Sequence, residues 1–325
     1  MILAGDVGGT KTHLALYEPG SSVRAPALER RLPSREYATL EALVREFLAS
    51  APAPPGRVVL GIAGPVVEQR IEATNLPWSI GAAELSAGLG GAPVLLINDL
   101  EATAWGLPLL DGKEIEVLHA GTPRPGNRAL IAAGTGLGEA LLIWDGATWR
   151  PCASEGGHTD FAPRDALEDE LLQWLRTRHR RVSYERILSG PGLADVYRFF
   201  AATGRGSASD DVAARFETAA DPAAVVSSAA LEGSCERARL TLERFVSIYG
   251  AEAGNLALKA LAVNGIFLGG GIAPRILPLL RSGGFLEALR DKGRMSPVLA
   301  RIPVTVLCDD RAALWGAARL ALAGT

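Results

Sequence analysis

Two short segments rich in Gly and Thr each lie between apolar stretches and have the composition of phosphate-binding turns. The first is Asp6-Val7-Gly8-Gly9-Thr10, and the second is Gly134-Thr135-Gly136-Leu137-Gly138. Glycines let backbone N–H groups approach phosphate oxygens that a Cβ would keep away. Neither segment has the GxxxxGK[ST] spacing of a P-loop. Taken alone, each segment is explained equally well as an ordinary hairpin turn. Because two matched turns are better explained by a shared ligand than by coincidence, we predict that they bind one polyphosphate.

A carboxylate and a third glycine-rich segment extend this predicted nucleotide site. Asp6 follows an apolar stretch, where its carboxylate could hold Mg²⁺ directly or through water, or could simply be solvated. Gly269-Gly270-Gly271 follows another apolar stretch, and successive glycines let a flat ligand lie against the backbone. A flexible helix entry is the alternative for this segment taken alone. The sequence is therefore compatible with a metal-bound nucleotide.

The dipeptide Asn98-Asp99 lies between a predicted strand at 94–97 and a predicted helix at 100–107. Asp is a common N-cap of helices, which is one interpretation of Asp99. The other is a general base, because a carboxylate next to an attacking hydroxyl orients it and takes its proton during phosphoryl transfer. The amide of Asn98 both donates and accepts hydrogen bonds, as contact with a sugar hydroxyl requires.

Three further polar side chains have the chemistry of a sugar-binding site. Glu155 and His158 belong to the segment Glu155-Gly156-Gly157-His158, and Glu185 precedes the segment Ser189-Gly190-Pro191-Gly192. Carboxylates and imidazole suit sugar hydroxyls, which both donate and accept hydrogen bonds. Taken alone, these residues are better explained as parts of solvated loops.

These residues occupy the turns of a chain in which strands and helices alternate. Two β-hairpins with a Gly/Thr turn are predicted at 2–17 and 129–144. Buried strands are predicted at 58–63, 94–97, 265–268 and 304–307, and helical segments at 39–49, 100–107, 164–204, 209–262 and 311–322, with a break at Ser189–Gly192. This alternation predicts an α/β protein, and the repeated hairpin indicates two domains built on one plan. Ligands of open α/β sheets bind at the carboxyl ends of strands, where the Gly-rich turns lie.

The composition limits the kinds of partner. The chain has 325 residues, 48% hydrophobic and 21% charged, which is enough for about two domains. Its net charge of −3 gives no basic excess, so we predict no nucleic-acid partner, and the basic run at 176–181 is interpreted as a solvated helix end. Three scattered cysteines indicate a reducing compartment and offer no zinc spacing. No apolar run reaches the ~20 residues of a transmembrane helix and no leader is recognisable, so we expect a cytoplasmic protein with no membrane partner.

Taken together, the motifs resemble the bacterial glucokinase family of the sugar kinase/actin/Hsp70 ATPase superfamily. Each motif alone is weak, but the set occurs in the family's order and runs nearly from end to end of the chain. The matching segments are GDVGGT at 5–10, GIAGP at 61–65, TNLPW at 74–78, INDLEA at 97–102, AGTGLG at 133–138, SEGGHTDFAP at 154–163, ERILSGPGL at 185–193 and GGGI at 269–272.

The resemblance implies two ribonuclease H-like domains, as in actin-like ATPases, with a cleft between them. It implies a smaller α/β domain at 1–105, completed by a C-terminal helix within 306–325, and a larger α/β domain at 106–305. It also implies a cytoplasmic homodimer.

The resemblance further implies that MgATP and glucose react to give glucose 6-phosphate and ADP, the step by which glucose enters glycolysis. Asp99 is then the base, the two Gly/Thr turns bind the ATP phosphates, and Asp6 is the metal residue. Gly269–Gly271 lie by the adenosine. Sugar hydroxyls are bound by Asn98, Asp99, Glu155, His158 and Glu185, with Asn75 as a weaker candidate.

Two other functions remain open on the sequence. A kinase for another hexose or amino sugar, such as mannose, fructose or glucosamine, would use the same motifs. A non-catalytic sugar sensor on this fold is expected to lose the base or a phosphate turn, and both are present. Sugar kinases and repressors of the ROK type carry a Cys-rich zinc motif after the sugar-binding His, whereas no Cys follows His158 until Cys235. We therefore expect the non-ROK branch and no bound zinc.

Overall fold

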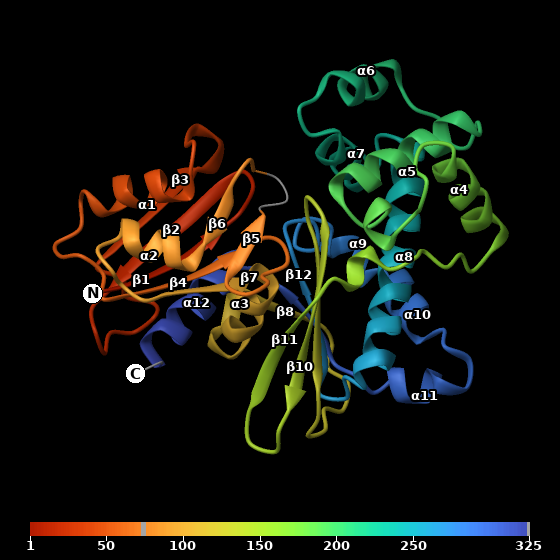
Figure 1. Ribbon diagram of the computed structural model, residues 1–325. Helices are drawn as coiled ribbons and strands as arrows, with labels where there is room; N and C mark the ends of the chain where they lie inside the picture. Colours follow the sequence, from red (N-terminus) through yellow and green to blue (C-terminus); the bar gives the residue numbers. More distant parts are fainter. Residues whose placement is uncertain (73–75, 324–325) are drawn as a thin grey trace. The chain divides into compact units, whose positions relative to one another are not determined.

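The computed structural model describes residues 1–72 and 76–323, and the chain divides into two compact units. Unit 1 consists of Met1–Glu114, Arg150–Ala153 and Asp309–Thr325, and unit 2 of Ile115–Trp149 and Ser154–Cys308. Each unit contains a β-sheet with helices packed against it (Figure 1). The predicted α/β class is therefore confirmed. No helix of the described residues is both long enough and apolar enough to span a membrane.

The sheet of unit 1 positions the first glycine turn and the Asn98-Asp99 dipeptide. Its strands are β1 (Ile2–Val7), β2 (Lys11–Tyr17), β3 (Leu28–Pro33), β4 (Arg57–Ile62) and β7 (Val94–Asn98), and β5 (Arg70–Glu72) and β6 (Ser79–Gly81) form a separate ribbon. The order in the main sheet is β3-β2-β1-β4-β7. Because β1, β4 and β7 are parallel, their carboxyl ends meet at one edge, and both motifs lie at that edge.

Helices cover both faces of the first sheet. They are α1 (Leu40–Leu48), α2 (Ala82–Gly88), α3 (Asp99–Gly106) and α12 (Ala312–Ala323), with the short 3-10 helices η1 (Ser34–Glu36), η2 (Leu107–Leu109) and η3 (Gly112–Glu114). Successive strand side chains point to opposite faces. Leu3 accordingly packs with Phe47 of α1 on one face, and Ala4 packs with Leu314 of α12 on the other. α12 packs so closely on α3 that Gly316 leaves no room for a Cβ beside the Ala102 carbonyl.

The second sheet carries the second and third glycine segments. Its strands are β8 (Ile115–His119), β9 (Arg128–Ala133), β10 (Leu137–Trp144), β11 (Trp149–Ser154), β12 (Gly265–Gly269) and β13 (Val304–Leu307), in the order β11-β10-β9-β12-β13-β8. β9 and β10 form an antiparallel hairpin, whereas β9, β12 and β13 are parallel. The parallel strands bring the turn after β9 and the glycines after β12 to the same edge.

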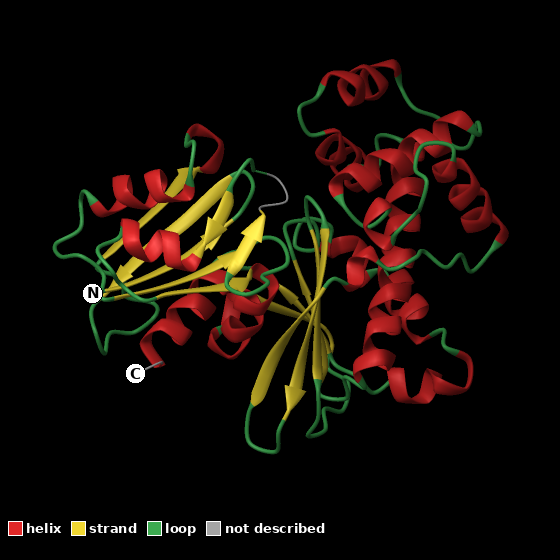
Figure 2. Cartoon of the chain, viewed as in Figure 1, coloured by secondary structure: helices red, strands yellow, loops and turns green. Residues whose placement is uncertain are grey.

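Unit 2 is rich in helices, which Figure 2 shows in red beside the second sheet. They are α4 (Ala166–Arg176), α5 (Gly190–Ala202), α6 (Asp210–Thr218), α7 (Pro222–Leu231), α8 (Glu236–Ala260), α9 (Leu277–Arg281), α10 (Gly284–Arg290) and α11 (Ser296–Leu299), with η4 (Gly156–His158), η5 (Tyr184–Arg186) and η6 (Gly293–Met295). α8 packs against α5, α7, α10 and β9, and its residues Phe245 and Tyr249 are fully buried. This long helix therefore forms the centre of the unit 2 core.

The observed elements differ from the predicted ones in identifiable ways. The predicted helix break at Ser189–Gly192 is wrong, because α5 begins there. The Ser189 hydroxyl accepts a 3.1 Å hydrogen bond from the Gly192 N–H. Pro191 lies in the first turn of α5, where a backbone N–H would have no acceptor within the helix, so the missing N–H of proline costs nothing there. The helical segment predicted from residue 164 is instead interrupted at 177–189. The edge strands β3, β8 and β11 were not predicted.

Candidate active site

The first glycine turn joins β1 to β2 and is braced by Ser34. The Gly8 N–H donates to the Lys11 carbonyl at 3.0 Å, which closes the turn. The Ser34 hydroxyl donates to the Gly8 carbonyl at 2.7 Å, and the Ser34 N–H donates to the Thr10 carbonyl at 3.0 Å. Ser34 Oγ also lies 2.9 Å from Thr12 Oγ1, and both side chains are fully buried. The turn is thus held from inside while Thr10 stays exposed at its tip.

Carboxylates accumulate near the carboxyl edge of the first sheet. Asp6 lies near the end of β1, where the protein covers most of its surface. Burial, followed by the negative charges of Asp99 and Asp310, raises the pKa of Asp6 to about 7, and Arg31 opposes this shift. Arg31 itself holds Asp310 through two hydrogen bonds of 2.6 and 2.8 Å. The local excess of negative charge favours a cation at Asp6.

The donor set fits Mg²⁺ bound mainly by water and phosphate. Among the described residues, no three His, Cys, Asp or Glu side chains are grouped as a complete metal site. Mg²⁺ usually keeps several waters and takes one or two carboxylates together with substrate phosphates. Asp6 beside the first glycine turn offers one such carboxylate, which is consistent with its predicted metal role.

Asn98 and Asp99 have different structural roles at the start of α3. Asn98 is the N-cap, because its Oδ1 accepts hydrogen bonds from the N–H groups of Leu100 and Glu101 at 2.8 and 3.2 Å. Its Nδ2 donates to the Gly64 carbonyl at 3.0 Å. Asp99 is the first helical residue and is partly exposed, and its Oδ1 accepts from the Leu100 N–H at 2.9 Å. The N-cap interpretation of Asp99 is therefore wrong, and the cap is its neighbour.

The second glycine turn contacts the third glycine segment and the start of α5. The Gly134 N–H donates to the Gly136 carbonyl at 2.8 Å, and the Gly190 N–H donates to the Gly134 carbonyl at 2.8 Å. Gly270 has a φ of +79°, and it lies too close to the Ala133 carbonyl to admit a Cβ. The predicted phosphate turn and adenosine segment are therefore neighbours within unit 2. The positive end of the α5 dipole also lies at this turn, which favours an anion there.

The structure brings the three predicted sugar residues of unit 2 together. His158 Nε2 lies 3.8 Å from Glu155 Oε2, and His158 Nδ1 lies 3.7 Å from Glu185 Oε1. All three side chains retain exposure to solvent. Glu185 Oε2 accepts a 3.0 Å hydrogen bond from the N–H of Leu137, the first residue after the Gly134–Gly136 turn. Asn75, the remaining candidate, lies outside the described residues.

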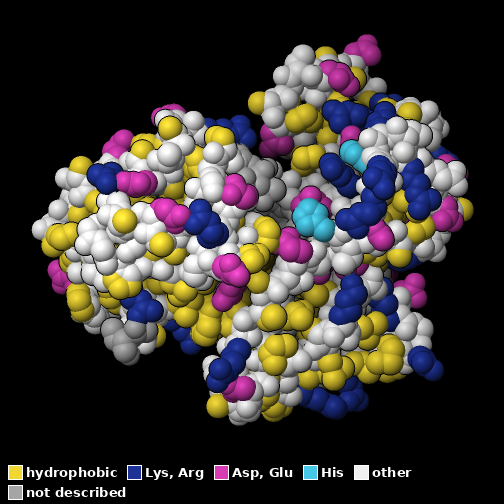
Figure 3. All heavy atoms as spheres, in the orientation of Figure 1, with side chains coloured by type: hydrophobic (Ala, Val, Ile, Leu, Met, Phe, Trp, Pro, Cys, Tyr) yellow, Lys and Arg dark blue, Asp and Glu magenta, His cyan; other side chains and the backbone are white. Residues whose placement is uncertain are grey.

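The basic run that follows α4 also contributes to the sugar cluster. Arg181 Nη2 donates to the His158 carbonyl at 2.8 Å, and Nη1 donates to Asp160 Oδ1 at 2.8 Å. Arg178 stacks over the ring of Trp174 at 3.5 Å. Lys and Arg side chains gather over this part of unit 2 (Figure 3). The predicted solvated helix end thus includes one residue that fixes the backbone of His158.

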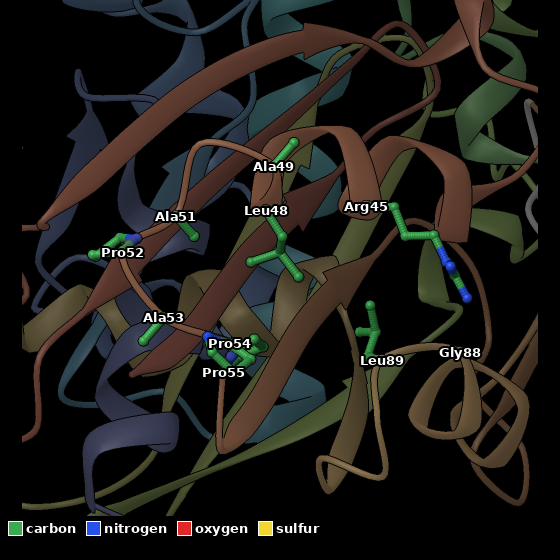
Figure 4. A pocket seen from close by; sticks show the side chains of 10 residues that line it. All are labelled: Arg45, Leu48, Ala49, Ala51, Pro52, Ala53, Pro54, Pro55, Gly88 and Leu89. Carbon is green, nitrogen blue, oxygen red and sulfur yellow. The ribbon is translucent and has the colours of Figure 1, made fainter.

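A hollow in unit 1 lies away from these residues. It is lined by Arg45 and Leu48 of α1, the loop at 51–55 and the end of α2 (Figure 4). The N–H of Gly56 donates to the Met1 carbonyl, so this loop lies at the start of β1, whereas Asp6 lies near its end. The lining contains no carboxylate or hydroxyl side chain. The hollow is therefore not part of the candidate active site.

Sequence reasoning missed two residues that support the first turn and its charges. Ser34 follows the segment LERRLP at 28–33, which contains three consecutive charged residues, and nothing in that pattern distinguishes Ser34 from a surface serine. Asp310 does carry a signal, because it follows the apolar segment 304–307 much as Asp6 follows the apolar start of β1.

Comparison with known proteins agrees with the resemblance seen in the sequence. The family model described as Glucokinase matches residues 3–323. The glucokinase of Nostoc punctiforme (strain ATCC 29133 / PCC 73102) is 39% identical over 98% of this chain and 98% of its own. The crystal structure of a glucokinase from an Antarctic psychrotroph superposes with a TM-score of 0.81 at 32% identity and covers 98% of both chains.

A more distant structure shares the fold. The crystal structure of glucokinase from Balamuthia mandrillaris in complex with glucose has a TM-score of 0.82 at 22% identity, covering 98% of this chain and 93% of the other. These structural matches confirm the predicted actin-like ATPase type of fold. Because the family model and the Nostoc relative both extend over nearly the whole sequence, the chain belongs to the glucokinase family.

Proposed function

We propose that this protein is an ATP-dependent kinase that converts glucose to glucose 6-phosphate and releases ADP. Its membership of the glucokinase family over nearly the whole chain supports this activity. The observation that carries the proposal is the 3.0 Å hydrogen bond from the Leu137 N–H to Glu185 Oε2. It joins a carboxylate suited to sugar to a turn suited to phosphate, and phosphoryl transfer depends above all on positioning its two reactants.

Asp99 acts as the general base in this mechanism. Its carboxylate takes the proton of the attacking sugar hydroxyl while the hydroxyl oxygen bonds to the γ-phosphorus. The bond from that phosphorus to the bridging oxygen breaks, and ADP leaves with the electron pair. The capping of α3 supports this role, because Asn98 is the N-cap of the helix and the Asp99 carboxylate is not required for capping.

The ATP phosphates bind at the two glycine turns, at Gly8, Gly9, Thr10, Gly134, Thr135 and Gly136. The N–H groups of Gly8 and Gly134 close the turns internally, so the N–H groups of the other four residues contact the phosphates. Asp6 would hold Mg²⁺, which neutralises phosphate charge when it is bound. The raised pKa of Asp6 supports this assignment, because a carboxylate surrounded by negative charge gains most from a cation. Gly269, Gly270 and Gly271 would lie by the adenosine, next to the second turn.

We assign sugar recognition to Glu155, His158 and Glu185, together with Asn98 and Asp99. The mutual contacts of His158 with the two glutamates support a shared ligand, since each carboxylate can accept from one hydroxyl while the imidazole contacts another. Asn75 completes the proposed set. The glucose seen in the complex of the Balamuthia enzyme supports glucose as the sugar.

The domain organisation and cellular context belong to the same proposal. We infer a smaller domain at 1–105 completed by residues within 306–325, and a larger one at 106–305. The division into two compact units, with Asp309–Thr325 in unit 1, supports it. A cytoplasmic location and a homodimer are implied by the resemblance to the family.

A sugar panel tests the activity directly. ADP release at saturating MgATP is measured with glucose, mannose, fructose and glucosamine. We expect the highest kcat/KM with glucose, and ADP release by the Asp99→Asn variant that is about 10²- to 10⁴-fold slower. ADP release that does not depend on glucose, or a better substrate among the other sugars, would contradict the proposal.

A further inference from the structure

A buried acidic pair lies against the glycines of the Glu155–His158 segment. Glu139 of β10 is 1% exposed, and Glu252 of α8 is fully buried. The two carboxyl groups interact directly, and Glu252 Oε1 lies 3.5 Å from the ammonium of Lys259. Within the described part of the chain, Oε1 of each glutamate is buried without a hydrogen-bond partner. Because buried carboxylate oxygens need donors, a proton on the pair is the simplest way to satisfy them.

One proton per pair is also what electrostatics requires. Two adjacent carboxylates away from water cannot both be charged without a large penalty. Burial, followed by the charge of Glu252, raises the pKa of Glu139 to about 8, while Lys259 opposes the shift. We therefore expect Glu139 to be protonated at neutral pH, next to the carboxyl group of Glu252.

The pair contacts both segments that carry the proposed sugar residues. Glu139 Oε2 lies against Gly156, so closely that a Cβ on this glycine would collide with it. Glu252 Oε2 accepts a 2.8 Å hydrogen bond from Asn255 Nδ2, which also donates to the Tyr184 hydroxyl at 3.1 Å. Gly156 lies between Glu155 and His158 in sequence, and Tyr184 directly precedes Glu185. Both segments thus rest on one buried network.

We propose that Glu139 and Glu252 share a proton and act as a positioning pair for the sugar-binding side chains of unit 2. Loss of the proton would place two charges side by side in the core, and their repulsion would displace the segments at Gly156 and Tyr184. The role is one of positioning, because both glutamates are buried. The proposal rests on the sugar-binding role proposed above for Glu155, His158 and Glu185.

Other ionisable groups face the pair from the surrounding elements. Lys259 and Tyr249 come from α8, Tyr184 from η5, and Lys292 from the segment before η6. Burial raises the pKa of both tyrosines, so they remain neutral where the pair titrates. Burial lowers the pKa of Lys292, whose charge also acts on Glu252. The test must therefore change Glu139 itself rather than rely on a pH profile alone.

The Glu139→Gln variant separates the shared proton from the shape of the side chain. Its amide fills the same space and donates an N–H to Glu252 at any pH. The Michaelis constants for glucose and ATP are measured between about pH 6 and about pH 10. We expect the wild-type KM for glucose to rise roughly tenfold above about pH 8, with the KM for ATP changed less than about twofold. In Glu139→Gln the KM for glucose should stay low and flat over the same range.

A second variant removes the support. Glu139→Ala removes the carboxyl group that lies against Gly156 and leaves Glu252 without its acidic partner, so the KM for glucose should rise roughly tenfold already at neutral pH, more than that for ATP. The control is Glu217→Gln on the exposed surface of α6. The idea fails if Glu139→Gln keeps the wild-type alkaline rise, or if folded Glu139→Ala binds glucose as wild type does. Should Glu139→Ala not fold, the profile of Glu139→Gln decides alone.

A stability measurement distinguishes failure of the pair from failure of the sugar site. The folded protein holds the proton of Glu139 more tightly than the unfolded chain, whose ordinary pKa is 4.5. The resulting stabilisation is complete below that value and is lost as the pH rises to about 8. The Tm of wild type should therefore fall relative to that of Glu139→Gln across this range. Equal slopes would refute the shared proton, whereas unchanged glucose binding in Glu155→Ala and His158→Ala would refute only the sugar site.

Discussion

The hydroxyl of Ser34 donates a 2.7 Å hydrogen bond to the carbonyl of Gly8 and so links η1 to the first glycine turn. The same oxygen contacts Thr12 Oγ1 at the start of β2. Since the turn has no side chain of its own at Gly8 or Gly9, its conformation depends on this outside support. A turn that binds phosphate through backbone N–H groups works only if those groups keep a fixed direction.

Ser34→Ala should weaken ATP binding more than glucose binding. The substitution leaves the Gly8 carbonyl and the Thr12 hydroxyl without this partner, at a cost of about 1–2 kcal/mol. We expect a rise of roughly 5- to 30-fold in the KM for ATP, measured by ADP release at saturating glucose. Ser50→Ala, at an exposed position, is the control. A lower Tm with an unchanged KM for ATP would show that Ser34 serves only the fold.

Asp99→Asn should nearly abolish turnover while leaving glucose binding largely intact. The amide keeps the shape of the carboxylate but takes no proton, and a positioned base contributes about 10²- to 10⁴-fold. Turnover is measured by ADP release, and glucose binding by calorimetry. Asp111→Asn, whose carboxylate is largely exposed, is the matched control. Turnover within a few-fold of wild type would leave Asp99 no role as the base.

Glu155→Ala and His158→Ala should each raise the KM for glucose by about 5- to 150-fold, because a buried hydroxyl of the sugar then loses its partner at ~1–3 kcal/mol. The KM for ATP should change much less. Deoxy sugars identify which hydroxyl each side chain binds. The increase in KM caused by the substitution should be smaller for the sugar that lacks the hydroxyl bound by the deleted side chain. Glu217→Ala provides the surface control. If neither variant affects glucose, the sugar contacts lie elsewhere.

Gly270→Ala and Gly271→Ala should have different effects although the residues are adjacent. Gly270 has a positive φ and lies against the Ala133 carbonyl, so an alanine there should lower the Tm and disturb the second turn. Gly271 has no atom near the position of a Cβ, so its substitution should leave the Tm unchanged. If adenosine lies on this segment, Gly271→Ala should still raise the KM for ATP. Equal losses of Tm would contradict the geometry.

The parts of the fold that sequence could predict are those in which the local pattern and the tertiary environment agree. The strands at β4 and β7 are apolar runs that are buried in the sheet, and the turns at Gly8 and Gly134 follow from glycine chemistry. β8 could not be predicted in this way, because it pairs with β13, which lies far along the chain. β3 reads LERRLP and is an edge strand, with exposed charges on alternate residues. Its pairing with β2 stabilises it more than its own composition does.

The candidate site was likewise predictable only where local sequence carries the information. The types of Asp99, Glu155, His158 and Glu185 indicated their chemistry, but no spacing in the sequence predicts that His158 lies between the two glutamates. The buried Glu139 lies within the hairpin predicted at 129–144, where nothing in the local sequence distinguishes it. Its importance comes from Glu252, which the fold brings to it from the middle of α8. Long-range pairs of this kind depend on how helices are placed on a sheet.

The position of α12 sets the order in which the two units can be completed during translation. Residues 312–323 pack on β1 and α3, and Leu314, Ala317 and Ala318 fill the space beside Ala4 and Ala15. The ribosome synthesises β1 before the residues of unit 2 and α12 after them, although domains usually fold in the order of their synthesis. Unit 1 must therefore wait, with one face of its sheet uncovered, until unit 2 has been made. During synthesis the apolar face formed by Ala4, Ala15 and Val59 therefore lacks its native partner.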